Sequence, residues 1–255
     1  MEIKNIEKII KNLTEVFFNA GNVSIELRKK GLTEKIKKDQ TPVTNGDIEV
    51  NNIILSNLKK ITPNIPIISE ENVDNKNLNL DTFWLVDPID GTYDYINNRD
   101  EFTINAGLIV NKKAFAGIIY APAKTRMFYT YGNNISFELI NNNEKIINNK
   151  TTNKNNIKAV SYSNNLKPEI IKIHKKLNVK EYIKMKSSLK FCVIATGEYQ
   201  VYAAEPRAYE WDIAAGHAIL ENSGGIVSDF DGRNILYGKN KFKNPSIILK
   251  SKSDI

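Results

Sequence analysis

The stretch that decides the fold is Trp84-Leu85-Val86-Asp87-Pro88-Ile89-Asp90-Gly91-Thr92. Its apolar start, with the preceding phenylalanine, predicts a compact buried strand that stops at Asp87-Pro88. Asp87 and Asp90 stand three residues apart, and Pro88 restricts the backbone between them. Both carboxylates and the Ile89 carbonyl can therefore turn toward one point. Taken alone, Asp-Pro-x-Asp-Gly is also typical of a turn followed by a helix cap, so the interpretation depends on the rest of the chain.

Two further acidic residues occupy comparable places. Glu70 ends a short apolar strand pattern, and Asp212 begins a helix pattern far downstream. Strand ends in α/β sheets face the crevice where ligands bind, and carboxylates gathered there repel one another unless a cation neutralises them. Mg²⁺ prefers such oxygens and shares a substrate's phosphate. A pair of metal ions would clamp the attacking and leaving oxygens of a phosphoryl transfer, and a helix beginning after Gly91 would offer free N–H groups to a phosphate.

The composition excludes several classes of protein. A chain of 255 residues fits one large domain or two small ones. Its single cysteine, Cys192, excludes a disulfide framework and clustered-cysteine metal sites, and its two histidines argue against a multi-histidine centre. The sequence contains no run of 18 apolar residues, so it predicts no membrane span. The N-terminal segment is not typical of a secretory signal. A cytoplasmic protein is the expectation.

The net charge of +7 comes from 36 basic and 29 acidic residues, and the basic residues are scattered lysines far more often than arginines. A nucleic-acid binder would more often cluster arginines and interleave aromatic residues. We therefore expect a solvated lysine surface and no nucleic-acid partner. The positive potential would attract anionic small molecules.

Hydrophobic periodicity divides the chain into two halves of different character. The helical period predicts helices over 3–30, 46–58, 168–177, 191–197 and 212–223. Alternating or compact apolar runs predict strands over 66–69, 83–86, 102–110, 114–120, 129–140, 159–163, 182–185, 201–203, 226–228 and 246–249. Residues 32–45 read as a loop or irregular hairpin, and the polar stretch 141–156 reads as an exposed connection between the halves.

Several motifs occur together in one order along the chain. They are Thr41-Pro42-Val43-Thr44-Asn45-Gly46-Asp47, Ser69-Glu70-Glu71, the Trp84–Thr92 stretch, Trp211-Asp212-Ile213-Ala214-Ala215-Gly216-His217-Ala218 and Gly224-Gly225. In this combination the chain resembles the inositol monophosphatase superfamily of Mg²⁺-dependent, lithium-sensitive phosphatases. The resemblance implies a layered αβαβα sugar-phosphatase fold that combines an α+β half with an α/β half, with the active site between them.

Within the superfamily, further stretches are similar to the bacterial 3'(2'),5'-bisphosphate nucleotidases of the CysQ type. These stretches are Glu101-Phe102-Thr103-Ile104-Asn105, Ile119-Tyr120-Ala121-Pro122, Ser187-Ser188-Leu189-Lys190-Phe191-Cys192 and Glu210-Trp211-Asp212. The implied activity is removal of the 3'-phosphate from adenosine 3',5'-bisphosphate, which gives AMP and phosphate. An inositol monophosphatase or another sugar phosphatase of the superfamily is the first alternative. A non-enzymatic anion- or nucleic-acid-binding protein is the second.

The resemblance also assigns residues to roles. Glu70, Asp87 and the Ile89 carbonyl would hold one Mg²⁺, and Asp87, Asp90 and Asp212 a second, with Glu70 reaching a third through water. Thr92, hydrogen-bonded to Asp47, would orient or deprotonate the attacking water. The resemblance therefore implies that Asp47, Glu70 and Thr92 are the catalytic side chains. It also implies two or three Mg²⁺ per site. Residues 1–145 would then carry most metal ligands, and residues 146–255 would carry Asp212 and the substrate pocket.

The resemblance implies substrate contacts of several chemical kinds. The N–H groups of Gly91 and Thr92 would bind the phosphate that is removed, beside Asp212. Ser188 and Lys190 would contact the second phosphate or the ribose, with a helix cap and a surface lysine as the alternative interpretation. Glu205 precedes Asp212 by seven residues, which is similar to the spacing of a sugar-binding glutamate in inositol monophosphatases.

Two positions depart from the nucleotidase pattern. Tyr93 follows Gly91-Thr92 where a lysine is usual, and Arg207 is displaced from the usual arginine position. The substrate pocket is therefore mixed in character. The sequence leaves open the physiological substrate, the number of metals, a homodimer and a peripheral association with the inner membrane.

Overall fold

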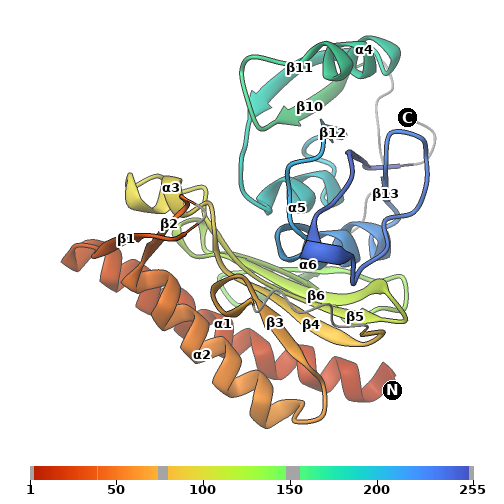
Figure 1. Cartoon of the computed structure of the whole chain (residues 1–255). Helices are drawn as coiled ribbons and strands as arrows, with labels where there is room; N and C mark the ends of the chain where they lie inside the picture. Colours follow the sequence, from red (N-terminus) through yellow and green to blue (C-terminus); the bar gives the residue numbers. More distant parts are fainter. Residues whose placement is uncertain (1–2, 39, 74–79, 148–155, 253–255) are drawn as a thin grey trace.

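The computed structural model describes residues 3–38, 40–73, 80–147 and 156–252, which form five layers in the order helix, sheet, helix, sheet, helix (Figure 1). Two long helices cover one face of a seven-stranded sheet, two helices separate this sheet from a five-stranded sheet, and one helix packs on the far side. The helices are α1 (Ile3–Lys30), α2 (Asn45–Ile61), α3 (Thr92–Ile96), α4 (Pro168–Lys176), α5 (Leu189–Ala195) and α6 (Glu210–Asn222). This confirms the layered αβαβα fold.

The seven-stranded sheet has the order β3-β4-β5-β6-β7-β8-β9. Strands β3 and β4 pair in parallel, and every later neighbour pairs antiparallel. The strands are β3 (Ile67–Ser69), β4 (Phe83–Asp90), β5 (Thr103–Val110), β6 (Lys113–Ala121), β7 (Arg126–Thr130), β8 (Phe137–Ile140) and β9 (Asn143–Ile146). Because β3 and β4 run in the same direction, Glu70 and the Asp87–Asp90 segment emerge at the same edge of the sheet.

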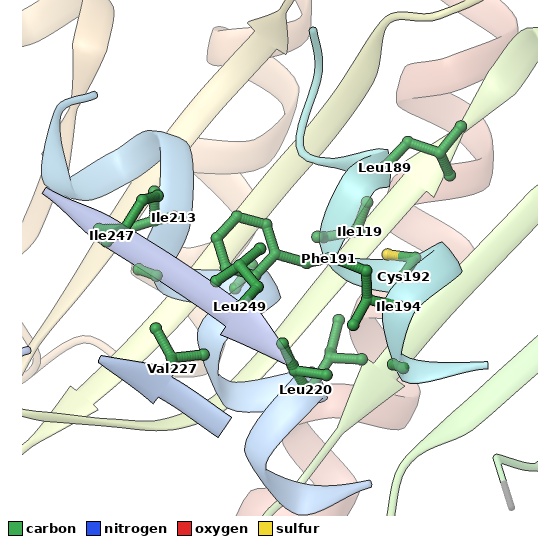
Figure 2. Close-up of a cluster of buried hydrophobic side chains, with 14 of the residues drawn as sticks. Ile119, Leu189, Phe191, Cys192, Ile194, Ile213, Leu220, Val227, Ile247 and Leu249 are labelled. Atoms are coloured by element: carbon green, nitrogen blue, oxygen red, sulfur yellow. The ribbon is translucent and has the colours of Figure 1, made fainter. Parts of the chain in front are cut away.

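The five-stranded sheet has the order β11-β10-β12-β14-β13. Its strands are β10 (Ile157–Ser161), β11 (Val179–Lys184), β12 (Val201–Ala204), β13 (Ile226–Ser228) and β14 (Ile247–Lys250). Figure 2 shows the core on its inner face, where Val227 and Leu249 from the strands meet Phe191 and Leu220 from α5 and α6. Cys192 is a buried free thiol in this core.

Strand β4 explains why the deciding stretch begins with consecutive apolar residues. Trp84 and Val86 pack toward α1 and α2, whereas Phe83 and Leu85 pack toward α5 and α6. All four side chains are fully buried. A strand that is covered on both faces needs no polar side, so its sequence is a continuous apolar run.

Two glycines let α6 approach the seven-stranded sheet closely. A Cβ atom added to Gly107 of β5 would lie 2.6 Å from the Ala214 Cβ, and one added to Gly117 of β6 would lie 2.7 Å from the Ala215 Cα. No larger residue fits between this helix and these strands without displacing backbone. The contact sets the height of α6 above the sheet and therefore the position of its first turn, which contains Asp212.

The structure differs from the sequence predictions at several strand ends. Strand β4 does not stop at Asp87 but continues to Asp90, with an irregularity opposite β5 between these two residues. The single strand expected over 129–140 is instead the two strands β7 and β8, separated by a turn. The expected connection over 141–156 begins with β9, whose residues are exposed, and its residues 148–155 lie outside the described residues.

The remaining predictions for local structure hold with small shifts. Residues 32–45 contain an irregular hairpin of β1 (Glu34–Ile36) and β2 (Pro42–Thr44). A short helix, α3, does begin after Gly91. None of the described helices combines the length and the hydrophobicity needed to cross a bilayer. The division of the chain at residues 145 and 146 stays a prediction.

Candidate active site

Asp47 is fixed by the first turn of α2. Thr44 is the N-cap of this helix, and Asp47 Oδ2 accepts hydrogen bonds from the Thr44 N–H (2.7 Å) and the Thr44 hydroxyl (2.6 Å), which completes a capping box. Burial raises the pKa of Asp47, although the bonds from Thr44 lower it. The capping box therefore holds the carboxylate in one orientation and leaves Oδ1 to face its neighbour.

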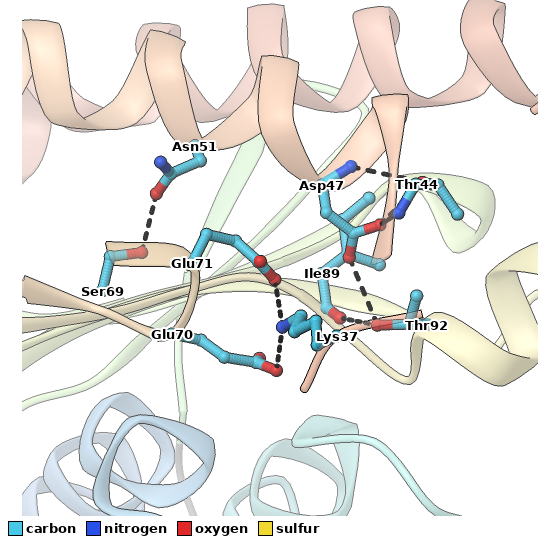
Figure 3. Close-up of polar contacts among 9 residues, drawn as sticks. All are labelled: Lys37, Thr44, Asp47, Asn51, Ser69, Glu70, Glu71, Ile89 and Thr92. Atoms are coloured by element: carbon cyan, nitrogen blue, oxygen red, sulfur yellow. Dashed lines mark hydrogen bonds and ion pairs between the residues drawn. The ribbon is translucent and has the colours of Figure 1, made fainter. Parts of the chain in front are cut away.

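That neighbour is Thr92, at the start of α3. Its Oγ1 lies 3.2 Å from Asp47 Oδ1 and 3.1 Å from the Ile89 carbonyl oxygen (Figure 3). A hydroxyl carries one proton and donates to one acceptor at a time. When Thr92 donates to Asp47, its lone pairs remain to accept a hydrogen bond from a water molecule. The expected Thr92–Asp47 contact is present in the structure.

Two glycines make this contact sterically feasible. Gly91 has φ +92°, a left-handed conformation that favours glycine, and a Cβ here would lie 3.3 Å from the Glu101 carbonyl oxygen. A Cβ on Gly46 would lie 2.5 Å from the hydroxyl oxygen of Tyr95 in α3. The turn at Gly91 starts α3, and the bare backbone at Gly46 lets α3 lie against the start of α2.

Glu70 and Glu71 are paired with a lysine that the sequence analysis missed. Lys37 follows β1, and its Nζ lies 2.9 Å from Glu70 Oε1 and 2.7 Å from Glu71 Oε1 (Figure 3). Burial opposes the charge of Lys37, but the two glutamates raise its pKa above the usual value. Burial raises the pKa of Glu71 to about 7. No sequence signal distinguishes Lys37 from the other lysines of this polar segment.

Asp87 is a buried carboxylate, one oxygen of which has no hydrogen-bond donor among the described residues. Its side chain is 1% exposed, and no described group donates to its Oδ1. Burial raises the pKa of Asp87 well above its usual range, and the charges of Glu70, Asp90 and Asp212 raise it further. These acidic residues come from β4, the segment after β3 and the start of α6. The structure therefore brings together the four acidic side chains that were proposed as metal ligands.

Asp212 is positioned by α6 in the way that Asp47 is positioned by α2. It is the third residue of the helix, and its Oδ2 accepts a hydrogen bond of 2.8 Å from the Tyr209 N–H. Burial raises the pKa of Asp212 well above its usual range, and the charges of Asp90 and Glu70 add to this effect. Trp211 next to it is buried and stacked on Tyr209 at a centroid distance of 4.9 Å.

Ser188 joins the two halves of the site. Its N–H and its hydroxyl both contact Asp90 Oδ2, and its Oγ lies 2.8 Å from the Asp212 carbonyl oxygen. The Asn105 amide on β5 also contacts this Oγ, at 3.3 Å. The expected substrate contact is therefore a hydroxyl whose single proton is donated either to the Asp90 carboxylate or to the Asp212 carbonyl oxygen. Asn105 is a second residue to which the sequence analysis gave no role.

Lys190 is 5% exposed, so it is not the surface lysine of the alternative interpretation. Its Nζ donates to the carbonyl oxygens of Ser187 (2.9 Å) and Lys186 (3.1 Å). Burial lowers the pKa of Lys190, and the charges of Asp90 and Asp212 oppose this effect. Lys190 thus places a buried cation beside the carboxylates of the second half.

Glu205 has a different set of neighbours. Its Oε1 accepts hydrogen bonds of 2.6 Å from the Tyr162 hydroxyl and from Lys167 Nζ. Burial would raise the pKa of Glu205, but these two donors lower it overall. Arg207 lies over the Tyr162 ring at 4.1 Å. The described contacts of Glu205 therefore all lie in the second half and do not include the four central acidic residues.

The side chains present fit a hard divalent cation. The donors are carboxylate and carbonyl oxygens, and Asp87 Oδ1 is a buried carboxyl oxygen that lacks a hydrogen-bond partner among the described residues. Among the described residues, no three acidic or histidine side chains are arranged as a ready ligand set for one ion. The contacts give the reason, because Glu70 turns to Lys37, Asp90 to Ser188 and Asp212 to Tyr209. Mg²⁺ needs only one or two carboxylates besides water and phosphate.

Comparison with known proteins identifies the family. The model of the inositol monophosphatase family matches residues 5–254. The chain is 36% identical over 243 residues to 3'(2'),5'-bisphosphate nucleotidase CysQ of Buchnera aphidicola, a match that covers 92% of this chain and 90% of that protein. It is 31% identical to the protein of the same name from Salmonella typhimurium, with 93% of this chain and 97% of the relative covered.

A solved structure agrees with these matches. The crystal structure of CysQ from Bacteroides thetaiotaomicron, described as a bacterial member of the inositol monophosphatase family, superposes with a TM-score of 0.77 at 27% identity. The superposition covers 93% of this chain and 94% of that one. The resemblance that the sequence motifs indicated is therefore confirmed. The chain is a phosphatase that belongs to the inositol monophosphatase family.

Proposed function

We propose that the chain is a Mg²⁺-dependent 3'(2'),5'-bisphosphate nucleotidase that hydrolyses the 3'-phosphate of adenosine 3',5'-bisphosphate to AMP and phosphate. The observation that carries the phosphatase chemistry is the convergence of Asp87, Glu70, Asp90 and Asp212 beside the Thr92–Asp47 pair. The choice of substrate is supported by the names of the relatives whose aligned sequences are 36% and 31% identical to this chain.

The Thr92–Asp47 pair positions the attacking water. Thr92 donates a hydrogen bond to Asp47, so Thr92 Oγ1 is left to accept a hydrogen bond from the water. This bond directs a lone pair of the water oxygen toward phosphorus. Because Asp47 is locked by its capping box, the orientation of Thr92 is set before substrate binds. The N–H groups of Gly91 and Thr92, at the start of α3, are proposed to hold the phosphate oxygens, since the first N–H groups of a helix lack intrahelical acceptors.

The acidic residues are proposed to hold Mg²⁺: Glu70, Asp87 and the Ile89 carbonyl on one side, and Asp87, Asp90 and Asp212 on the other. Mg²⁺ at such a site lowers the pKa of bound water and stabilises charge on the phosphate and on the leaving oxygen. Lys37 Nζ lies 2.9 Å from Glu70 Oε1, so a metal ion held by Glu70 would compete with this lysine. Ser188 would hold Asp90 at a fixed distance from Asp212.

An inositol or sugar phosphatase remains the second candidate because of Glu205, whose distance from Asp212 in the sequence suits a contact to sugar hydroxyls. In the structure Glu205 Oε1 is engaged by Tyr162 and Lys167, whereas Oε2 is buried and has no hydrogen-bond partner among the described residues. The contacts of Glu205 therefore do not choose between the two candidates, and the choice of the nucleotidase rests on the names of the relatives.

A phosphate-release assay tests the choice. Adenosine 3',5'-bisphosphate and myo-inositol 1-phosphate are compared with Mg²⁺ present, and Asp87→Asn serves as the inactive control. We expect the nucleotide to be hydrolysed with the higher kcat/KM and lithium to inhibit the reaction. Much faster turnover of the inositol phosphate would refute the nucleotidase. Steeply salt-dependent RNA binding without any turnover would favour the non-enzymatic alternative.

A further inference from the structure

Glu210, the first residue of α6, is a fully buried carboxylate to which the proposed mechanism gives no role. Its Oε2 accepts a hydrogen bond of 2.9 Å from the Gly238 N–H, and its Oε1 accepts one of 2.8 Å from the Lys239 N–H. The Lys239 ammonium lies 2.8 Å from the same Oε1. A carboxylate is buried at a high cost unless its oxygens are bonded in this way. Glu210 therefore holds the chain at residues 238 and 239 against the start of α6, two residues before Asp212.

The segment held by Glu210, residues 237–243, also contacts the first half of the chain. The Tyr237 N–H donates to the carbonyl oxygen of Lys112, in the turn between β5 and β6, at 3.0 Å. A Cβ on Gly238 would lie 3.3 Å from the carbonyl oxygen of Leu80, which precedes β4. The segment therefore joins the start of α6 to the seven-stranded sheet.

The other end of this segment packs on the residues that flank Asp212. The centroid of the Phe242 ring lies 5.7 Å from that of Trp211, and the Trp211 ring is stacked on Tyr209 at a centroid distance of 4.9 Å. Tyr209 also forms a β-bridge with Lys243. The N–H of Tyr209 is the group that donates to Asp212 Oδ2. The position of this N–H, and with it the orientation of the Asp212 carboxylate, therefore depends on the segment.

Asp212 needs this support more than Asp47 does. Asp47 Oδ2 accepts two hydrogen bonds from Thr44, one from its N–H and one from its hydroxyl. Asp212 Oδ2 accepts one hydrogen bond from the described residues, from the backbone of Tyr209. A helix whose cap residue is a tyrosine lacks the short hydroxyl side chain that makes threonine a good cap. Contacts from outside α6 have to supply the second restraint.

We propose that Glu210 is a positioning residue of the active site. It fixes segment 237–243, and the segment fixes the Tyr209 N–H that orients Asp212 for metal binding. The inference goes beyond the proposed function and rests on it, because it takes Asp212 to be a ligand of Mg²⁺. Glu210 touches neither metal nor substrate in this role. Its loss therefore weakens Mg²⁺ binding and leaves the KM for substrate at saturating Mg²⁺ unchanged.

The first test compares Glu210→Gln with the unmutated chain. Glutamine keeps the size of the side chain, but its NH₂ group cannot accept one of the two N–H bonds. We expect the Mg²⁺ concentration for half-maximal phosphate release to rise about tenfold, within the range of 10–100-fold for groups that support metal ligands. The increase in melting temperature caused by Mg²⁺ should become smaller. Glu221→Gln is the matched control, because Glu221 lies on the same helix, pairs with His217 and is half exposed.

A second measurement needs neither turnover nor metal. The chain has two tryptophans, so replacing both by fluorotryptophan gives two fluorine NMR signals. Trp211 lies in the stack beside Asp212, whereas Trp84 is fully buried on the α1–α2 side of the sheet and serves as the internal reference. Glu210→Gln should shift or broaden the Trp211 signal and leave the Trp84 signal in place. Glu221→Gln should change neither signal.

A third variant keeps the proposal testable if Glu210→Gln does not fold. Phe242→Leu leaves the bonds of Glu210 intact but removes the ring that packs on Trp211, so it breaks the same chain of contacts at its other end. Its half-saturating Mg²⁺ concentration should also rise, with an unchanged KM at saturating Mg²⁺. A normal Mg²⁺ dependence in Phe242→Leu would contradict the role of the segment.

The outcomes are separable. A lower melting temperature of Glu210→Gln with a normal Mg²⁺ dependence and an unmoved Trp211 signal would show that Glu210 serves stability alone, and would overturn the proposal. A higher KM at saturating Mg²⁺ would overturn it as well, because it would indicate a role in substrate binding. If the unmutated chain is not stabilised by Mg²⁺ and releases no phosphate, the proposed function fails. The positioning role then fails with it, through a result seen in the unmutated chain rather than in the variants.

Discussion

The two halves of the active site are built in different ways. In the first half, Asp47 and Thr92 are set by contacts within a few residues of each: a capping box for Asp47 and a glycine turn for Thr92. In the second half, Asp212 depends on how closely α6 packs against Gly107 and on the bonds that Ser188 makes across the halves. Local caps and turns thus orient Asp47, Thr92 and Asp212, whereas contacts between distant segments, such as that of Ser188 with Asp90, bring the two halves together.

The largest effect should come from removing one central carboxylate from either half. We expect Asp87→Asn and Asp212→Asn each to lower kcat/KM at least about 10³-fold, which is about 4 kcal/mol of transition-state stabilisation. Both residues share the same charge cluster, so neither half can compensate for the other. Asp231→Asn, an exposed residue paired with Arg233, is the control. If only one of the two variants is inactive, the site does not span both halves.

The next largest effect is expected at the Thr92–Asp47 pair. Thr92→Ala should lower kcat about 10²-fold, the usual contribution of a positioned acid–base group. Thr92→Ser keeps the hydroxyl bonded to Asp47 and should recover most of the rate. Steady-state kinetics with the preferred substrate provides the measurement. Equal losses in the alanine and serine variants would show that the methyl group, rather than the hydroxyl, is what matters.

The same contrast explains how much the sequence could predict. Asp87, Asp90, Thr92 and Asp47 lie in short motifs whose local geometry follows from turns and caps, and the structure brings them together as expected. The fold followed from the order of these motifs and from apolar runs such as Phe83–Val86. Strand ends were less certain, because Pro88 suggested a stop where β4 in fact continues to Asp90.

The rest could not be predicted because it depends on distant contacts. Lys37 has no sequence feature that marks it, and it reaches Glu70 only through the β1–β2 hairpin. Ser188 was predicted to touch substrate, but its partner Asp90 lies 98 residues away in the chain. Whether Lys190 is buried or exposed depends on the packing of α5, which periodicity does not specify.

Gly107 tests the long-range half directly. Gly107→Ala adds a methyl group that would lie 2.7 Å from the Ala215 backbone nitrogen. Overpacking of this kind destabilises a fold by about 1–3 kcal/mol, and the displacement of α6 should lower activity between about tenfold and 10²-fold. Gly232→Ala is the control, because Gly232 has φ +80° but nothing within 4 Å of the added Cβ. Unfolding curves and kcat/KM are measured for both variants, and equal activity losses would argue against a role for the height of α6.

The smallest effect is expected at Ser188. Ser188→Ala removes the hydroxyl between Asp90 and Asp212 but keeps the backbone N–H that contacts Asp90. Residues that orient metal ligands typically change metal affinity or activity by about 10–100-fold, and the retained N–H places the expected loss near the lower limit. A Mg²⁺ titration of activity should show a higher half-saturating concentration with little change in KM for the nucleotide. A large rise in KM at saturating Mg²⁺ would instead indicate a direct substrate contact.

We expect carboxylates from both halves to form one cluster around the buried Asp87 that binds divalent cations. Burial raises the folded-state pKa of Asp87 and Asp212, and such a group stabilises the fold below its unfolded pKa and loses that contribution as pH rises through the folded value. Without Mg²⁺, the melting temperature should therefore fall as the pH rises above about 4, the unfolded-state pKa of an aspartate, and Asp87→Asn should reduce this fall.

The most direct measurement is thermal unfolding at about pH 8 with and without Mg²⁺, in the unmutated chain and in Asp87→Asn. We predict that Mg²⁺ raises the melting temperature of the unmutated chain by several degrees and that of Asp87→Asn by much less, because a ligand stabilises only the state that binds it. Equal stabilisation of both proteins, or none of either, would contradict a metal site built on Asp87.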